Sequence, residues 1–176
     1  MDLGQMILTF ANDFNVAMWK LLWALGMLVG LLYVGSSLLK MQRASRFPGQ
    51  NPVTFGDILP VIIVGTLMWN LSTFLNTTWN SFGMGATVYG PLSYSGAAAI
   101  GGKFEPMVNA GLTLVSIFGG VFFFKGLLLL KKASSGQASQ GDDFVWKALT
   151  HMLGGAALVN IPKVLEATQA SFGIMW

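Results

Sequence analysis

Four long apolar segments, separated by short polar ones, form the main pattern of the chain. Residues 21–39 and 58–79 contain no charged side chain, and residues 106–130 contain only Lys125. An α-helix rises about 1.5 Å per residue, so a helix of this length nearly or fully spans a bilayer core of about 30 Å. We therefore predict a membrane-spanning helix in each of these three segments.

The fourth segment, residues 144–172, is less apolar and less regular. Lys163 and Glu166 are three residues apart, so on a helix they would share one face and could form an ion pair. Pro162 predicts a kink, because proline removes a backbone hydrogen bond inside a helix. We expect one side of this helix to face protein or water, whether the helix crosses the membrane or lies along it.

The polar segments that follow the first and third apolar segments are basic. Residues 40–52 are broken by glycine and proline, which predicts a loop, and residues 131–143 predict a second polar turn. Their cations include Lys40, Arg43 and Arg46 in the first and Lys131 and Lys132 in the second.

The polar segment in the middle of the chain, residues 81–102, is rich in glycine, serine and alanine instead of charge. It predicts a connector at the opposite membrane face. Trp79, Tyr89 and Tyr94 lie in or next to it and suggest an aromatic belt at the membrane interface, where amphipathic rings gather.

The composition supports a lipid-embedded protein and excludes several kinds of chemistry. Hydrophobic residues make up 53% of the 176 residues and charged residues 10%, against about 25% charged in a typical soluble domain. The mean hydropathy is +0.62. The chain has no cysteine and one histidine, which excludes disulfides and multi-histidine metal sites. We expect no metal cofactor and no enzymatic activity.

Two stretches, residues 65–83 and 155–173, match each other at a constant offset of 90 residues and predict an internal repeat. Both end in the tripeptide Ser-Phe-Gly. The identical pairs are Gly65/Gly155, Asn70/Asn160, Leu75/Leu165, Thr78/Thr168, Ser81/Ser171, Phe82/Phe172 and Gly83/Gly173.

The repeat predicts the fold class and the topology. Each copy reads as an apolar helix, a basic turn and a second helix, so we predict an all-α membrane protein of two tandem helical hairpins. The chain would form a single domain, 1–176, with one hairpin in residues 1–90 and the other in 91–176. Both basic turns then lie on the same side. The positive-inside rule places them in the cytoplasm and both termini outside.

The cations of the basic turns are the main candidates for binding. They either hold the cytoplasmic side of the membrane or bind the headgroups of anionic lipid. Lys125 is either an intramembrane site or a side chain that extends toward Lys131 and the membrane surface. Small residues let helices approach closely, and the glycines that we predict at helix contacts are Gly26, Gly30, Gly119, Gly120, Gly154 and Gly155.

The hairpin of two apolar helices around a basic turn resembles the pilins of conjugative type IV secretion systems. Over its full length, in stretches such as MDLGQMILTFANDFN and HMLGGAALVNIPKVLEATQASFG, the chain resembles the TraQ family of IncI-type conjugation systems. That family is similar to the DotE (IcmC) and DotP (IcmD) components of type IVB secretion. The chain differs from single-hairpin pilins in having two hairpins and no evident leader, and we expect no cleaved secretory signal.

The resemblance implies a structural subunit of a type IVB-like conjugation apparatus that polymerises with itself into a helical pilus. It implies bound phospholipid, such as phosphatidylglycerol, with the basic residues near the headgroups and facing the lumen. Transferred DNA would pass through the lumen without sequence-specific binding. Other secretion subunits are expected partners. The chain would lie in the bacterial inner membrane before assembly and in the extracellular pilus afterwards.

Two alternatives remain open from the sequence. The chain could be a non-polymeric inner-membrane component of the same apparatus, or a small membrane transporter or channel. The first three apolar segments contain no carboxylate, and this absence disfavours a proton-coupled transporter, which needs a titratable group there.

Overall fold

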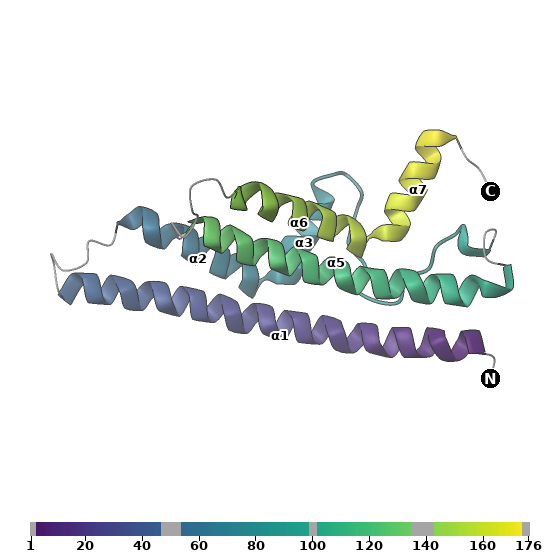
Figure 1. The fold of residues 1–176 in the computed structure, drawn as a ribbon, viewed down its shortest axis with the longest axis horizontal. Helices are drawn as coiled ribbons and strands as arrows, with labels where there is room; N and C mark the ends of the chain where they lie inside the picture. The colour runs from purple at the N-terminus through teal and green to yellow at the C-terminus, as the bar shows by residue number, and fades with distance from the viewer. Residues whose placement is uncertain (1–2, 47–53, 99–101, 135–142, 174–176) are drawn as a thin grey trace.

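The computed structural model describes residues 3–46, 54–98, 102–134 and 143–173, and these ranges contain helices and no strand (Figure 1). Their α-helices are α1 (Leu3–Arg46), α2 (Phe55–Trp69), α3 (Leu71–Asn80), α5 (Glu105–Ser134), α6 (Phe144–Val159) and α7 (Ile161–Phe172). A short 3-10 turn, η1 (Gly102–Phe104), precedes α5.

Two of these helical stretches, Leu3–Arg46 and Gly102–Ser134, are long and apolar enough to cross a membrane. The number rises to four if the bent pairs α2–α3 and α6–α7 each count as one span. The described part of the chain is thus all helical, and two to four of its helical stretches are long and apolar enough to span a membrane, as the apolar pattern predicts. The segments that join α1 to α2 and α5 to α6 lie mostly outside the described residues.

Helix α1 is much longer than the apolar pattern predicts. It has 44 residues, about 66 Å at the usual rise, and begins at Leu3 instead of residue 21. The prediction of a loop from residue 40 is wrong for residues 40–46, which continue the helix through Arg46. Lysine, methionine, glutamine, arginine and alanine all favour helix, and basic side chains stabilise the C-terminal end of a helix dipole.

The second and fourth apolar segments each break into two helices at an asparagine. The bend is 91° between α2 and α3 and 87° between α6 and α7. Asn70 and Asn160 stand at the bends with non-helical backbone angles, φ −104° and ψ 44° for the first and φ −106° and ψ 33° for the second. Asparagine favours such breaks because its side chain competes for backbone hydrogen bonds. At the second bend, Asn160 Nδ2 donates to the Ala156 carbonyl at 3.0 Å.

The predicted kink at Pro162 therefore lies two residues too late. Pro162 occupies the first turn of α7, where a missing N–H costs nothing. The predicted ion pair between Lys163 and Glu166 is also wrong. In the described part of the chain, Lys163 Nζ instead donates to backbone carbonyls of Met84 and Ala86, and Glu166 Oε1 accepts from Ser95 Oγ at 3.2 Å.

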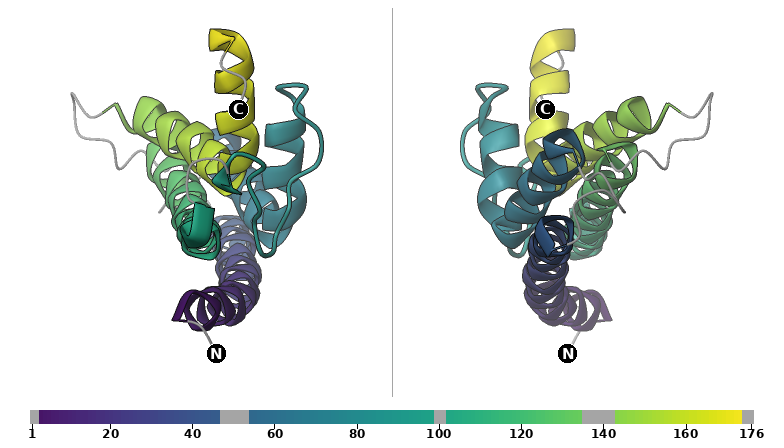
Figure 2. Two further views of the ribbon diagram at one scale, coloured as in Figure 1. Left: turned by 90° about the vertical axis from the view of Figure 1, so that its right-hand side faces the viewer. Right: turned by 90° about the vertical axis from the view of Figure 1, so that its left-hand side faces the viewer.

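The long helices run along the molecule and pack in pairs, α1 against α2 and α5 against α6, with α1 also against α5. Seen end-on, α1 lies at the base, α5 and α6 lie on one side and α2 and α3 on the other (Figure 2). The core between them contains Trp19, Leu22, Val64, Met68, Leu71, Leu75, Trp79, Phe123, Leu127, Met152, Ala156 and Val159.

The connector packs along the helices instead of lying loosely beyond them. Leu92 N donates to Thr113 Oγ1 at 3.0 Å, and Tyr94 N donates to Asn109 Oδ1 at 3.1 Å, both on α5. Tyr89 Oη donates to the Ser72 carbonyl of α3 at 2.6 Å. These bonds satisfy polar backbone groups that could not be left unpaired away from water.

The predicted aromatic belt is consequently wrong. Trp79 and Tyr94 are only 3% and 5% exposed, so they face protein instead of lipid. The ring of Tyr89 lies edge-on to Trp19 and Trp23, with centroids 5.0 and 5.7 Å away. The aromatic residues hold the connector against α1.

The packing of Tyr89 has a consequence for pH dependence. Burial raises the pKa of the Tyr89 hydroxyl to about 12, above the usual value near 10. Its contribution to the free energy of unfolding is intact below pH 10 and is lost as the pH rises toward 12. We expect the difference between the 295 nm titrations of the native chain and Tyr89→Phe to show this late ionisation. A Tyr89 that ionises near pH 10 would contradict the packed connector.

Candidate lipid-headgroup site

A cavity of about 260 Å³ lies at the C-terminal end of α5, beside α1. Its lining combines positive charge with apolar surface. The residues are Tyr33 of α1 and Lys125, Leu128, Leu129, Lys131 and Lys132 of α5. Lys131 Nζ lies 5.4 Å from the centroid of the Tyr33 ring, within the range of a cation–π contact.

The sequence of α5 explains this composition. Residues three, four and seven apart share a helix face, which places Lys125, Leu128, Leu129 and Lys132 on one side of α5. The charges of Lys131 and Lys132 also stabilise the last turn of the helix dipole. The result is a site where apolar side chains and ammonium groups lie together.

Such a lining suits an amphiphile with a negative head. Leucine side chains and lysine methylenes can contact acyl chains while the ammonium groups contact a phosphate. Each lysine or arginine near an anionic lipid surface is worth about 1 kcal/mol. The cavity is therefore a candidate site for the headgroup of an anionic phospholipid.

The structure brings together three of the six predicted headgroup residues. Lys125, Lys131 and Lys132 line one cavity. Lys40, Arg43 and Arg46 lie on α1 instead, and the first of them is about 10 Å beyond Tyr33 along the helix. The C-terminal ends of α1 and α5 point toward the same end of the molecule, on the left of Figure 1.

Four of the predicted packing glycines lie where helix backbones almost touch. A Cβ atom on Gly30 would be 2.5 Å from the Gly65 carbonyl oxygen, and one on Gly119 would be 2.7 Å from the Gly155 carbonyl oxygen. Gly26 meets the Met68 carbonyl oxygen in the same way, at 2.7 Å. Gly155 completes this set because its own Cβ would be 2.6 Å from Phe123 N.

The other two predicted glycines have different surroundings. A Cβ atom on Gly120 would be 2.8 Å from the Trp19 ring of α1. The prediction of a helix contact at Gly154 is wrong within the described chain. Gly154 lies on the exposed side of α6, and apart from its own stretch of helix no described atom is within 4 Å of its Cβ position. Successive helix residues are rotated by about 100°, so Gly154 cannot share the α5-facing side with Gly155.

Two further glycines, Gly65 and Gly126, lie at close contacts between helices and were not predicted. Gly126 lies against Met152 of α6, whose Cγ would be 2.5 Å from a Cβ there. Gly65 was visible in the repeat, since it matches Gly155, and both glycines occupy equivalent crossings of the two helix pairs.

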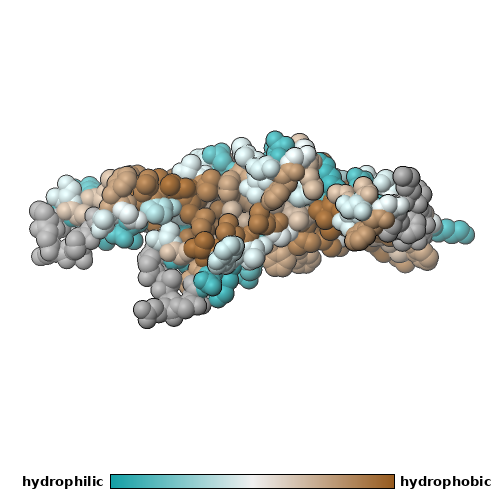
Figure 3. Space-filling model, turned by 90° about the horizontal axis from the view of Figure 1, so that it is seen from above, coloured by the Kyte–Doolittle hydropathy of each residue, from teal (hydrophilic) through white to brown (hydrophobic). Residues whose placement is uncertain are grey.

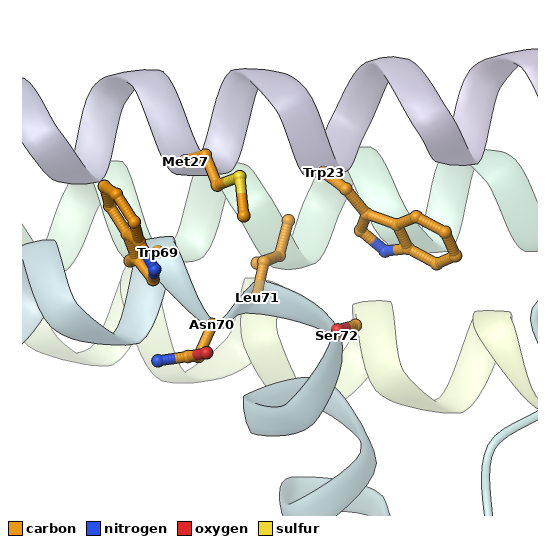
Figure 4. A pocket seen from close by; sticks show the side chains of 6 residues that line it. All are labelled: Trp23, Met27, Trp69, Asn70, Leu71 and Ser72. Carbon is orange, nitrogen blue, oxygen red and sulfur yellow. The ribbon is translucent and has the colours of Figure 1, made fainter.

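A second cavity, of about 230 Å³, lies at the α2–α3 bend and was not predicted (Figure 4). Trp23 and Met27 of α1 line it together with Trp69, Asn70, Leu71 and Ser72. Trp23 Nε1 is buried and has no hydrogen-bond partner in the described residues. The one sequence signal for this site was an asparagine in the middle of an apolar segment, because such a residue is costly in a membrane helix.

Comparisons with known proteins add no relative to this description. No protein-family model matches the chain, no curated protein matches it, and no solved structure matches its fold. Its function is therefore argued from its own residues and their arrangement.

Proposed function

We propose that this chain is the lipid-associated pilin of a conjugative, type IVB-like secretion system. The observation that carries the proposal is the cavity in which Lys125, Lys131 and Lys132 lie beside leucines, at the end of a helix long enough to cross a membrane. A phospholipid, with phosphatidylglycerol as the best candidate, places its phosphate among these lysines and its acyl chains along the helices.

The arrangement of helices supports two tandem hairpins, the fold that this proposal requires. Helices α1 and α2 pack together, as do α5 and α6, and each pair is followed by a bent helix, α3 or α7. The bends fall on Asn70 and Asn160, which are identical partners in the sequence match. The first hairpin occupies residues 1–90 and the second 91–176, with the basic turns on one side.

The apolar surface of α1 supports polymerisation. Only 22% of an apolar 18-residue stretch of α1 is buried within the chain, against 44% of the corresponding stretch in Gly102–Ser134. On the opposite side of the molecule, away from α1, the space-filling view also shows apolar residues over much of the visible face (Figure 3). At about 66 Å, α1 is also twice as long as a bilayer core is thick, so lipid alone does not cover it. Contacts with further copies would cover the remainder in a pilus.

The pilin acts in two places in this proposal. Before assembly it resides in the bacterial inner membrane. It is then incorporated, together with its lipid, into the extracellular pilus. The basic residues line the lumen, and transferred DNA passes through without sequence-specific contacts, as the resemblance to conjugative pilins and the TraQ family implies. Other subunits of the secretion system bring about the assembly.

The proposal is tested by intact-mass and lipid analysis of filaments sheared from donor cells. We expect this chain to dominate the filaments at a fixed ratio of phospholipid to protein. The double variant Lys131→Gln/Lys132→Gln should weaken lipid binding roughly 30-fold, since two charges of about 1 kcal/mol each are lost. Lys103→Gln, which removes a lysine at the other end of the helix, should leave the ratio unchanged.

Two other outcomes of this experiment would contradict parts of the proposal. A chain that stays entirely in the inner-membrane fraction is an accessory component of the apparatus and not the pilin. Filaments that contain the chain without phospholipid would contradict the lipid site alone.

A further inference from the structure

The two helix pairs of the chain, α1–α2 and α5–α6, cross in the same way. A Cβ atom on Gly30 of α1 would be 2.5 Å from the Gly65 carbonyl oxygen of α2, and one on Gly119 of α5 would be 2.7 Å from the Gly155 carbonyl oxygen of α6. Residues of α5 therefore correspond to residues of α1 at an offset of 89, and residues of α6 to residues of α2 at an offset of 90. This correspondence allows the surfaces of the two pairs to be compared residue by residue.

The second helix pair is displaced along the molecule relative to the first. Helices α1 and α5 run in the same direction, and a Cβ atom on Gly120 would be 2.8 Å from the Trp19 ring and 3.0 Å from Leu22 Cδ1. The crossing of the second pair is therefore level with these residues of α1. It lies about ten residues before the crossing at Gly30, which is roughly 15 Å of helix. Figure 1 shows this displacement, with α6 farther to the right than α2.

Each long helix has a free face directly opposite the face that contacts the other long helix. On α5, Gly111 precedes Gly120 by nine residues, which at 100° per residue places it on the opposite side. On α1, Leu31 follows Leu22 by nine residues and is likewise opposite. Gly111 is the counterpart of Leu22, and Leu31 is the counterpart of Gly120. Leu31 is exposed, and apart from its own stretch of helix no described atom lies within 4 Å of the Gly111 Cβ position.

The residues around these two positions follow the same correspondence. Val29 and Tyr33 of α1 pack against the core, but their counterparts on α5, Phe118 and Phe122, are exposed. The reverse holds for buried residues of α5, whose counterparts on α1 are exposed. These pairs are Thr113/Ala24, Ser116/Met27 and Leu127/Leu38. Both halves of a second contact of the same kind thus lie at the surface.

A shallow groove of about 240 Å³ adjoins the free face of α5, between α5 and α6. It is lined by Phe122, Thr150, His151, Gly154, Gly155 and Leu158. The counterparts of these residues on the first helix pair are Tyr33, Pro60, Val61, Val64, Gly65 and Met68. That surface is covered, since Val64 and Met68 are buried in one core with Leu127 of α5. The groove is therefore the uncovered counterpart of an occupied surface, and Leu38 is the counterpart of the leucine that α5 contributes.

We propose that α1 and α2 of a second copy pack against α5 and α6 of this chain, as α5 and α6 pack against α1 and α2 within it. Leu31 of the second copy then contacts Gly111, and its Leu38 enters the groove beside Gly154. All long helices keep one direction, which agrees with copies inserted by the same topology signals. The two neighbours of each long helix lie on opposite faces, so they do not compete for space.

This contact has a consequence for assembly. It joins two different surfaces and includes a translation, so it is heterologous and does not close. Each copy advances by two steps of the displacement between the helix pairs, roughly 30 Å in total. The inference rests on the proposed pilin function and deepens it, since it specifies the surfaces by which the subunits polymerise. It also gives Gly154 a role, as a small residue that leaves room for the neighbouring copy.

Thiol crosslinking tests the contact, because the native chain contains no cysteine. We expect the double variant Gly111→Cys/Leu31→Cys, treated with a short bifunctional thiol reagent in isolated membranes and in sheared filaments, to yield dimers, trimers and longer oligomers. Coexpressed single variants should stop at dimers, and either single variant alone should yield none. Dimers from a single variant would overturn the proposal, as would the absence of crosslinks from the double variant in both fractions.

Val121→Cys/Leu31→Cys provides a matched control on the same two helices. Val121 is the counterpart of Leu32, which stays exposed although α5 lies beside α1. The control pair should therefore yield no oligomers. Oligomers as abundant as those from Gly111→Cys/Leu31→Cys would show nonspecific association and contradict the proposed contact.

Substitution of Gly154 tests the groove separately. In the double-cysteine background, Gly154→Trp should fill the groove and reduce the yield of oligomers about tenfold, as overpacking of a contact does. Gly154→Val should retain the oligomers, because its counterpart in the covered surface is Val64. Both variants should keep the midpoint of thermal unfolding in detergent within about 2 °C, since Gly154 is exposed within the chain. Oligomers that persist in Gly154→Trp would overturn the groove contact.

The fraction in which oligomers form separates this inference from the proposed function. Filaments that contain the chain but yield no oligomers would leave the pilin function intact and remove this contact. Oligomers in membranes from cells whose filaments lack the chain would retain the contact and remove the pilin function.

Discussion

Replacement of Gly155 by valine is expected to force α6 away from α5 and to destabilise the protein strongly. A Cβ atom at this position would be 2.6 Å from Phe123 N and 2.7 Å from the Gly119 carbonyl oxygen. Both neighbours are backbone atoms, so the strain cannot be relieved by a side-chain rotation. Overpacking of this kind costs about 1–3 kcal/mol. We expect the midpoint of thermal unfolding in detergent to fall by roughly 5–10 °C.

Gly154→Val provides a matched control on the same helix. It makes the same chemical change and has the same intrinsic effect on helix propensity. Gly154 is exposed, and apart from its own stretch of helix no described atom lies within 4 Å of its Cβ position. Its midpoint should fall by no more than about 2 °C, as for other surface changes. An equal decrease of the unfolding midpoint in the two variants would show that α5 and α6 do not cross at Gly155.

The second large effect is expected from Lys163→Met, which should release the connector from α7. Lys163 Nζ donates to the carbonyl oxygen of Met84 at 3.2 Å and to that of Ala86 at 2.5 Å. Methionine keeps the length of the side chain and loses both bonds. A hydrogen bond to a charged group contributes about 1.5–3 kcal/mol when it is shielded, and less at this partly exposed site.

Hydrogen exchange measures this release directly. We expect the amides of the connector, residues 84–98, to exchange roughly tenfold faster in Lys163→Met, as a loss of about 1.4 kcal/mol would produce. Exchange in the middle of α5 should remain unchanged. Glu166→Gln serves as the control, because its amide oxygen can still accept from Ser95 Oγ. Unchanged exchange of the connector would show that Lys163 does not anchor it.

The two bends show which features of the fold the sequence predicts and which depend on packing. The repeat identifies Asn70 and Asn160 as equivalent positions. The apolar pattern, however, does not predict a bend of about 90° at either one. Hydropathy is summed over a window of residues and is insensitive to a single polar position. The proline at 162 was the more obvious local signal, but at the start of a helix it breaks nothing.

The candidate site was predicted in part. Lys125, Lys131 and Lys132 are close in sequence on one helix, so their common face follows from helical periodicity. The contribution of Tyr33 could not be foreseen, because it depends on the register between α1 and α5. The same register places Lys20 level with the middle of the apolar run of α5, and no local pattern reports how two distant helices align.

Local chemistry was thus sufficient for the all-helical class, the apolar segments and the clustering of lysines on α5. These follow from hydropathy, helix propensity and the spacing of residues along one helix, which neighbours in sequence specify. The bends, the docking of Tyr89 and Tyr94, the different roles of Gly154 and Gly155, and the depth of Lys20 required the packed structure. Each depends on contacts between segments far apart in the chain, and a one-dimensional pattern does not contain those distances.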